Sequence, residues 1–167
     1  LMKSKENLVF LGMMGSGKSS IGLMVSKKLN IDFVDIDQEI EKKIGMTISK
    51  IFENQGEKYF REVEEMITLK LLKKNKTVIS LGGGAFLNNK IKKEILENHL
   101  SFWLNWEINT LIKRIKNNQK RPLALNLSEK KLKELIKKRS IIYSEAMYKI
   151  NCENLSKNEI VKSIINI

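Results

Sequence analysis

The chain has 167 residues, 42% of them hydrophobic, which suffices for one core and favours a single domain over residues 1–167. A net charge of +12 suggests a polyanionic partner, but lysine pairs spread along the expected helices favour solvated faces, and we expect no nucleic-acid partner. One cysteine excludes an internal disulfide, and no apolar run has the length of a membrane helix, so we expect a cytoplasmic protein with no membrane partner. We also expect a monomer.

The expected strands and helices alternate along the chain. Short apolar or β-branched runs predict strands at 8–11, 31–35, 77–81, 100–105 and 148–151. Apolar spacing and capping residues predict helices at 20–29, 37–44, 47–56, 57–74, 89–98, 107–116 and 128–148, and a final helix from Ser156 onward. This alternation indicates an α/β fold with three αβα layers around a five-stranded parallel sheet, with ligands at the carboxyl ends of the strands.

A phosphate-binding loop follows the first expected strand. Residues 12–19, Gly-Met-Met-Gly-Ser-Gly-Lys-Ser, match the pattern of Gly, four residues and Gly-Lys-Ser, and they open the next helix. Glycines allow backbone N–H groups to converge on phosphate oxygens, and the helix presents its positive end to the same anion. We therefore expect Lys18 to reach the β- and γ-phosphates and the Ser19 hydroxyl to bind Mg²⁺.

Two carboxylates, Asp35 and Asp37, follow the second expected strand, next to the phosphate loop. If the strand continues through both, alternation points them in the same direction. One would then serve the Mg²⁺ shell and the other a substrate hydroxyl. A helix-capping pair on the surface is the alternative, because an amphipathic run follows directly. These residues alone leave the choice open.

Further charged and glycine-rich positions are candidates for a binding site. Arg61 and Glu64 share one helix face, which also fits an ordinary surface ion pair. Three consecutive glycines end the strand at 77–81, and such a run is tolerated where a ligand or another backbone comes close. The cations Arg114, Arg121 and Arg139 follow later, and each taken alone also fits a solvated charge.

Taken together, these motifs resemble the shikimate kinase family in order and spacing, over nearly the whole chain. The motifs are residues 12–19, Phe33-Val34-Asp35-Ile36-Asp37, Phe60-Arg61 with Glu64, Leu81-Gly82-Gly83-Gly84, Arg121-Pro122-Leu123, and Arg139 with Tyr143. The resemblance implies a P-loop NTP hydrolase fold of the nucleoside-monophosphate-kinase-like type. It also implies transfer of the γ-phosphate of ATP to the 3-hydroxyl of shikimate, on the route to chorismate and the aromatic amino acids.

The resemblance implies roles for individual residues. ATP would contact Gly15, Ser16, Gly17, Lys18, Ser19, Ser20, Arg114 over the adenine, and Arg121. Shikimate would contact Asp37, Arg61, Gly82, Gly83, Gly84 and Arg139. The catalytic groups would be Asp37 as base with Lys18 and Arg121 as cations, while Ser19 and Asp35 serve Mg²⁺ and Glu64 holds Arg61. Residues of about 35–64 would form the helical substrate-binding segment, and about 117–126 a lid.

The chain departs from the family pattern in two places. Residues 139–143 read Arg-Ser-Ile-Ile-Tyr instead of the common Arg-x-Pro-Leu-Tyr, and 154–156 lack the basic residue and proline that some relatives have beside adenine. A gluconate-type sugar-acid kinase is one alternative, against which Phe60-Arg61 and the triple glycine argue. A basic nucleic-acid-binding P-loop ATPase is another and would need its lysines on one face. A regulatory GTPase lacks its Asn-Lys-x-Asp motif here.

Overall fold

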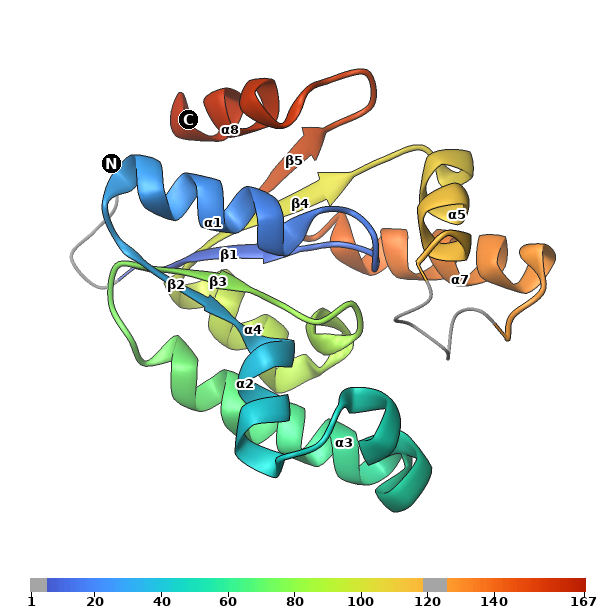
Figure 1. The fold of residues 1–167 in the computed structure, drawn as a ribbon. Helices are drawn as coiled ribbons and strands as arrows, with labels where there is room; N and C mark the ends of the chain where they lie inside the picture. The colour runs from blue at the N-terminus through green and yellow to red at the C-terminus, as the bar shows by residue number, and fades with distance from the viewer. Residues whose placement is uncertain (1–5, 119–125) are drawn as a thin grey trace.

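A five-stranded parallel sheet forms the centre of the computed structural model, which describes residues 6–118 and 126–167 (Figure 1). The strands are β1 (Leu8–Leu11), β2 (Asp32–Asp35), β3 (Thr77–Ser80), β4 (Leu100–Asn105) and β5 (Tyr148–Asn151), in the order β2-β3-β1-β4-β5. Each neighbouring pair is parallel. The expected α/β fold with five parallel strands is therefore confirmed.

Alternation along β1 divides the core between the two faces of the sheet. Val9 and Leu11 belong to one buried cluster, and Leu8 and Phe10 belong to the other. Helices α1 (Lys18–Leu29) and α8 (Lys157–Ile165) cover the Leu8 face, where Figure 1 shows them on the same side of the sheet. The opposite face is covered by helices α2 (Ile36–Ile44), α3 (Ile48–Leu72), α4 (Asn89–Asn98), α5 (Ile108–Lys116) and α7 (Glu129–Tyr143). Strands that are covered on both faces are apolar throughout, as β1 is.

Capping residues determine where several helices begin. The Asn88 side chain accepts from the backbone N–H groups of Lys90 and Ile91 at the start of α4, and a short 3-10 helix, η1 (Ala85–Leu87), precedes it. Ser156 opens α8 with the reciprocal capping box that its sequence predicts. Side-chain oxygens at these positions satisfy N–H groups that have no partner within the helix.

The predicted helix at 128–148 is too long. Ser128 caps α7, but the helix ends at Tyr143. The chain then has to turn, because Tyr148 pairs with Phe102 in the sheet and the N–H of Met147 donates to Ser101 Oγ at 2.8 Å. The helical pattern of the sequence continues beyond Tyr143, but pairing of the next strand ends the helix there.

Gly56 separates α3 into two parts. Its φ of 84° and ψ of 170° are not helical, which confirms the expected division between a short helix and a longer one. Thr47 caps the first part. The second part leads Arg61 and Glu64 to the carboxyl edge of the sheet, where they take part in the site described below.

A buried asparagine organises the opposite, amino edge of the sheet. The Asn7 amide donates to the carbonyls of Leu72 and Lys74 and accepts from the N–H of Thr77. Its backbone N–H donates to Nδ1 of His99 at 3.1 Å. His99 therefore has a structural role at this edge.

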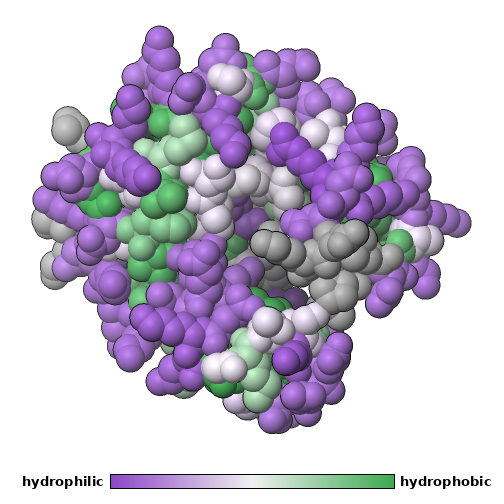
Figure 2. Space-filling model, in the orientation of Figure 1, coloured by the Kyte–Doolittle hydropathy of each residue, from purple (hydrophilic) through white to green (hydrophobic). Residues whose placement is uncertain are grey.

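The surface carries its charges on many elements. Exposed lysines occur on α1, α2, α4, α5 and α7, and Figure 2 shows hydrophilic residues over most of the visible face with smaller apolar areas between them. Within the described residues, no helix combines the length and apolarity needed to cross a bilayer.

Candidate active site

The phosphate loop lies between β1 and α1, at the carboxyl end of the central strand. Gly15 and Gly17 have φ values of 80° and 88°, a region that only glycine adopts readily. The loop closes with a hydrogen bond from the N–H of Ser16 to the carbonyl of Met13 at 3.1 Å. The sequence-predicted anion cradle is thus built by backbone conformation and by the amino end of α1.

The Lys18 side chain is held inside this loop. It is 7% exposed, and its ammonium donates to the carbonyls of Gly12 and Met13 at 2.9 Å each. These bonds orient the cation toward the loop that is shaped for phosphate. The neighbouring Ser19 hydroxyl donates to Asp35 Oδ2 and lies 3.3 Å from the hydroxyl of Ser80.

The two aspartates do not continue one strand. β2 ends at Asp35, whose Oδ1 caps α2 by accepting from the N–H of Gln38, while its Oδ2 accepts from Ser19. Asp37 lies in the first turn of α2. The expected alignment of both carboxylates required the strand to continue through Asp37, and it does not. Asp35 combines the capping interpretation with contact to the phosphate loop, and Asp37 is directed to the glycine loop instead.

The three glycines after β3 lie against charged side chains. A Cβ on Gly82 would lie 2.7 Å from Asp37 Oδ1 and 3.1 Å from Glu64 Oε2. A Cβ on Gly84 would lie 2.6 Å from a guanidinium nitrogen of Arg61. None of the three has a positive φ, so backbone conformation does not require glycine here; at Gly82 and Gly84 glycine is needed for space. At Gly82 and Gly84 the close approach inferred from sequence is thus an approach of side chains.

Gly83 connects this loop to the phosphate loop and to α7. A Cβ on Gly83 would lie 3.4 Å from Arg139 Nη1 and 3.5 Å from the backbone N of Met14. The Tyr143 hydroxyl donates to the Gly83 carbonyl. Arg139 Nε is buried without a hydrogen-bond partner among the described residues. An unpaired buried donor of this kind is costly in the free protein and suits a ligand acceptor.

A buried carboxylate holds Arg61. Glu64 Oε1 lies 2.8 Å from Arg61 Nη1, and the Glu64 side chain is 3% exposed. Burial raises the pKa of Glu64 above its ordinary value, and the adjacent Arg61 charge opposes that shift. The surface-pair interpretation of Arg61 and Glu64 is therefore wrong for Glu64. Arg61 itself stays partly open, with 35% of its side chain exposed.

The other side of the phosphate loop carries an aromatic and two cations. The Arg114 guanidinium lies 3.8 Å from the Trp106 ring centroid, and Arg114 Nη1 donates to the Gly15 carbonyl at 3.2 Å. The Trp106 indole N–H donates to the Ser16 carbonyl at 2.8 Å. From α8, the Lys157 ammonium donates to Ser20 Oγ at 2.9 Å. Arg121 lies outside the described residues.

Sequence reasoning missed Trp106 and Lys157 and gave no role to Tyr143. Trp106 follows the end of β4 and so shares the carboxyl edge of the sheet, a position that a closer look at the strand ends would have singled out. Lys157 follows a helix cap, where acidic residues are usual. Its contact with Ser20 joins residues 137 positions apart, and no local pattern indicates such a contact.

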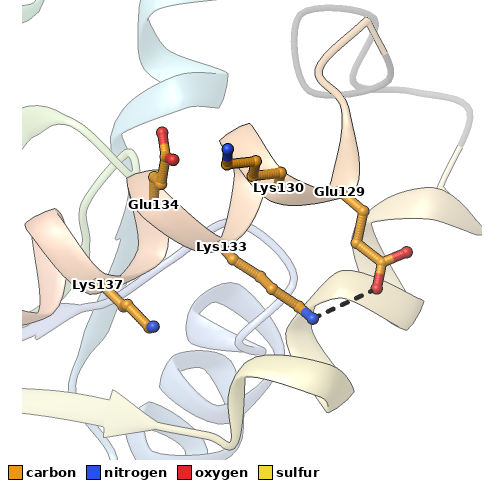
Figure 3. A pocket seen from close by; sticks show the side chains of 5 residues that line it. All are labelled: Glu129, Lys130, Lys133, Glu134 and Lys137. Carbon is orange, nitrogen blue, oxygen red and sulfur yellow. Dashed lines mark ion pairs between the residues drawn. The ribbon is translucent and has the colours of Figure 1, made fainter.

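An open pocket on α7 is separate from these groups. Its volume is about 470 Å³, and Figure 3 shows five charged side chains that line it: Glu129, Lys130, Lys133, Glu134 and Lys137. Lys133 and Glu129 form an ion pair at 3.7 Å within it. All five come from one helix, and none belongs to the loops described above. The pocket therefore does not mark the active site.

A phosphate loop on the central strand, with carboxylates and arginines gathered beside it, defines a P-loop kinase of the αβα type. A sequence profile described as Shikimate kinase matches residues 14–167. Shikimate kinases from Persephonella marina and Thermodesulfovibrio yellowstonii are 40% and 39% identical to the chain, each over 96% of it and over 97% and 93% of the relative. The chain belongs to the shikimate kinase family, and ATP-dependent shikimate kinase activity is its function.

A solved structure agrees with this assignment. The structure of shikimate kinase from Acinetobacter baumannii in complex with shikimate matches with a TM-score of 0.91 at 30% identity, over 97% of this chain and 92% of that one. The family resemblance inferred from the motifs is confirmed. Membership of this family argues against the alternative of a gluconate-type kinase.

Proposed function

We propose that the chain moves the γ-phosphate of ATP to the 3-hydroxyl of shikimate with the groups gathered around residues 82–84. One observation carries this proposal: the glycine loop lies against Asp37, Arg61 and Arg139 and, through Gly83, against the phosphate loop. Acceptor groups and phosphate groups thus share one edge of the sheet. Direct transfer between two bound substrates requires such proximity.

Arg61 and Arg139 would hold the carboxylate of shikimate. A guanidinium offers parallel donors that match the two oxygens of a carboxylate. The unpaired Nε of Arg139 and the partly exposed Arg61 both supply donors for such a ligand. Gly82, Gly83 and Gly84 would let the ring approach the backbone closely, and Glu64 would keep Arg61 in position.

Asp37 would accept the proton of the attacking hydroxyl. Its carboxylate lies at the glycine loop, and it comes from the helix that follows β2, the strand adjacent to β3. A carboxylate at this place can orient a substrate hydroxyl toward the phosphates and take its proton during transfer. Asp37 lies in the first turn of α2, at the positive end of that helix.

The phosphates of ATP would contact Gly15, Ser16 and Gly17 in the loop, with Lys18 as the cation at the transferred group. Ser19 and Asp35, already in contact, offer the hydroxyl and carboxylate oxygens that suit Mg²⁺, which takes its other ligands from water and phosphate. Mg²⁺ supplies charge neutralisation at the phosphates. Arg114 would lie over the adenine and Ser20 beside the phosphates; the role of Arg121 and of a lid at about 117–126 rests on the family resemblance alone.

Release of ADP on addition of shikimate to protein with Mg-ATP tests the proposal. Shikimate should stimulate ADP release strongly, and gluconate and nucleoside monophosphates should not. The phosphorylated product, isolated and analysed by phosphorus NMR, should carry its phosphate on the 3-hydroxyl. Equal stimulation by gluconate, or a phosphate on another hydroxyl, would overturn the proposal.

We further propose that residues 1–167 act as a single domain in which residues of about 35–64 bind shikimate.

A further inference from the structure

We infer that Tyr143 is a positioning residue: its hydroxyl fixes the peptide between Gly83 and Gly84, so that the Gly84 N–H is presented to shikimate. The inference rests on the proposed function, because it assigns a means by which the glycine loop binds that substrate. Tyr143 itself need not touch either substrate.

The Tyr143 hydroxyl is enclosed and has a defined acceptor. The residue is 1% exposed, its ring lies 6.1 Å from that of Trp103, and its hydroxyl donates to the Gly83 carbonyl. The sulfur of Met13, in the phosphate loop, lies 3.8 Å from the same oxygen. A hydroxyl has one hydrogen, and a carbonyl is a far better acceptor than a thioether, so the hydrogen goes to Gly83.

Fixing this carbonyl also fixes a donor. In a trans peptide the C=O of one residue and the N–H of the next point in opposite directions, and no cis peptide occurs among the described residues. The Gly83 carbonyl points at Tyr143, so the Gly84 N–H points away from it. Within the described parts of the chain, this N–H donates to no backbone carbonyl. It is therefore left for a ligand.

Glycine is the residue that needs such fixing most. The N–H of Ala85 donates to the Gly82 carbonyl at 3.2 Å and closes a turn, but with two central glycines the peptide between them can still take either orientation in such a turn. Burial raises the pKa of Tyr143 to about 12, which keeps the hydroxyl protonated and donating throughout the neutral range.

Tyr143 and Arg139 act on Gly83 from the same helix. They are four residues apart on α7 and so share one face of it, and Arg139 Nη1 lies 3.4 Å from a Cβ built on Gly83. Arg139 also neighbours the Tyr143 hydroxyl, where its charge opposes the rise in the pKa of that group. Both residues act on the glycine loop after β3, whereas Trp106 and Arg114 lie on the β4 side of the phosphate loop.

Tyr143→Phe tests the inference, with Tyr148→Phe as the matched control. Tyr148 lies in β5 and stacks on Phe102 of β4, away from the glycine loop. Tyr143→Phe should raise the KM and the Kd for shikimate about tenfold, the effect of weakening one hydrogen bond from the Gly84 N–H to the ligand. The KM for ATP and the slow ATP hydrolysis without shikimate should stay within about twofold of the parent, because the phosphate loop keeps its own bonds. Tyr148→Phe should change none of these values.

Restoring a donor should restore binding. With 4-aminophenylalanine at position 143 an N–H replaces the O–H, and the shikimate Kd should return to near the parent value. With 4-methylphenylalanine the volume is filled without a donor, and the Kd should stay raised. This pair replaces the phenylalanine variant if that variant is too unstable to assay.

A normal shikimate Kd in Tyr143→Phe, or equal weakening of shikimate and ATP, would overturn the inference and leave Tyr143 as a packing residue. If the unmodified protein bound no shikimate, the proposed function itself would fail, which is a different result.

Discussion

The guanidinium of Arg61 lies between two glutamates, 2.8 Å from the buried Glu64 and 3.6 Å from Glu57, whose side chain is 69% exposed. The two pairs have opposite surroundings although both lie on one helix. An exposed pair contributes little, whereas a buried carboxylate fixes its partner in direction as well as in distance.

Glu64→Gln should therefore raise the KM for shikimate by roughly tenfold to a hundredfold, the usual effect of losing a residue that orients a ligand-binding group. The kcat should fall less, because Arg61 is proposed to hold the carboxylate of shikimate and not the hydroxyl that is phosphorylated. Steady-state kinetics with shikimate varied measure both. Glu57→Gln is the control and should behave as the parent; if the two variants behaved alike, burial of Glu64 would have no part in binding.

Asp37→Asn should lower kcat by roughly a hundredfold or more, the range for loss of a general base, with a folded protein that still binds ATP.

Asp35→Asn should act differently from Asp37→Asn. Because Asp35 contacts Ser19 in the phosphate loop, its loss should raise the Mg²⁺ concentration required for half-maximal rate. Titration of each variant with Mg²⁺ separates the two. A near-normal kcat in Asp37→Asn would contradict its role as base.

Gly84→Ala should weaken shikimate binding without unfolding the protein. The new methyl group would lie 2.6 Å from the Arg61 guanidinium, which is the far end of a partly exposed side chain and can move aside by loosening its bond to Glu64. We expect a loss of about tenfold in shikimate affinity, comparable to losing one charged hydrogen bond. In an Arg61→Ala background the same substitution should have almost no further effect, which calorimetric titration of all four proteins measures. Additive losses would show that Gly84 acts independently of Arg61.

His99 should make the protein less stable in mild acid. Burial holds the pKa of His99 below its ordinary value of 6.5, and the Glu94 carboxylate opposes this only in part. Below that ordinary value the unfolded chain binds a proton that the folded protein refuses, so the free energy of unfolding falls as the pH falls through this range. The denaturant midpoint should therefore decrease between pH 7.5 and pH 5.5, an interval chosen to span the ordinary value of about 6.5.

His99→Asn provides the comparison, because an amide oxygen can accept from the Asn7 N–H in place of Nδ1. This variant should show a flatter dependence on pH. The raised pKa of Glu64 contributes a slope of opposite sign, since a folded carboxyl that holds its proton loses stability as the pH rises. It does so in both proteins, so the difference between them reports His99. Identical slopes would refute the assignment.

Local sequence patterns predicted the elements well where the cause is local. Helix α4 at 89–98 and strand β4 at 100–105 have the expected bounds, because a capping asparagine and a continuous apolar run determine them. The end of α7 could not be predicted from local sequence, since the pairing of Tyr148 with Phe102 decides it. Asp35 shows the same limit: its cap ends β2 and redirects Asp37.

The site was predictable in its residue types and not in its contacts. The glycine run at 82–84 indicated a close approach, but only the folded chain shows that the approaching groups are Asp37, Arg61 and Arg139. Arg61 with Glu64 fitted two interpretations equally, because sequence does not report how deeply Glu64 is buried. The Tyr143 bond to Gly83 spans 60 residues and depends on the packing of α7 against η1.

β1 lies in the middle of the sheet and separates the site into two halves that are built from different kinds of residue. On the β3 side the phosphate loop meets the glycines and the charged groups proposed for the acceptor; on the β4 side it meets Trp106 and Arg114, proposed for the nucleotide. Substitutions in one half leave the other half's contacts in place. New acceptor preferences can therefore arise on this scaffold while ATP use is retained, and an inhibitor confined to the β3 half would discriminate among P-loop kinases that all share the nucleotide.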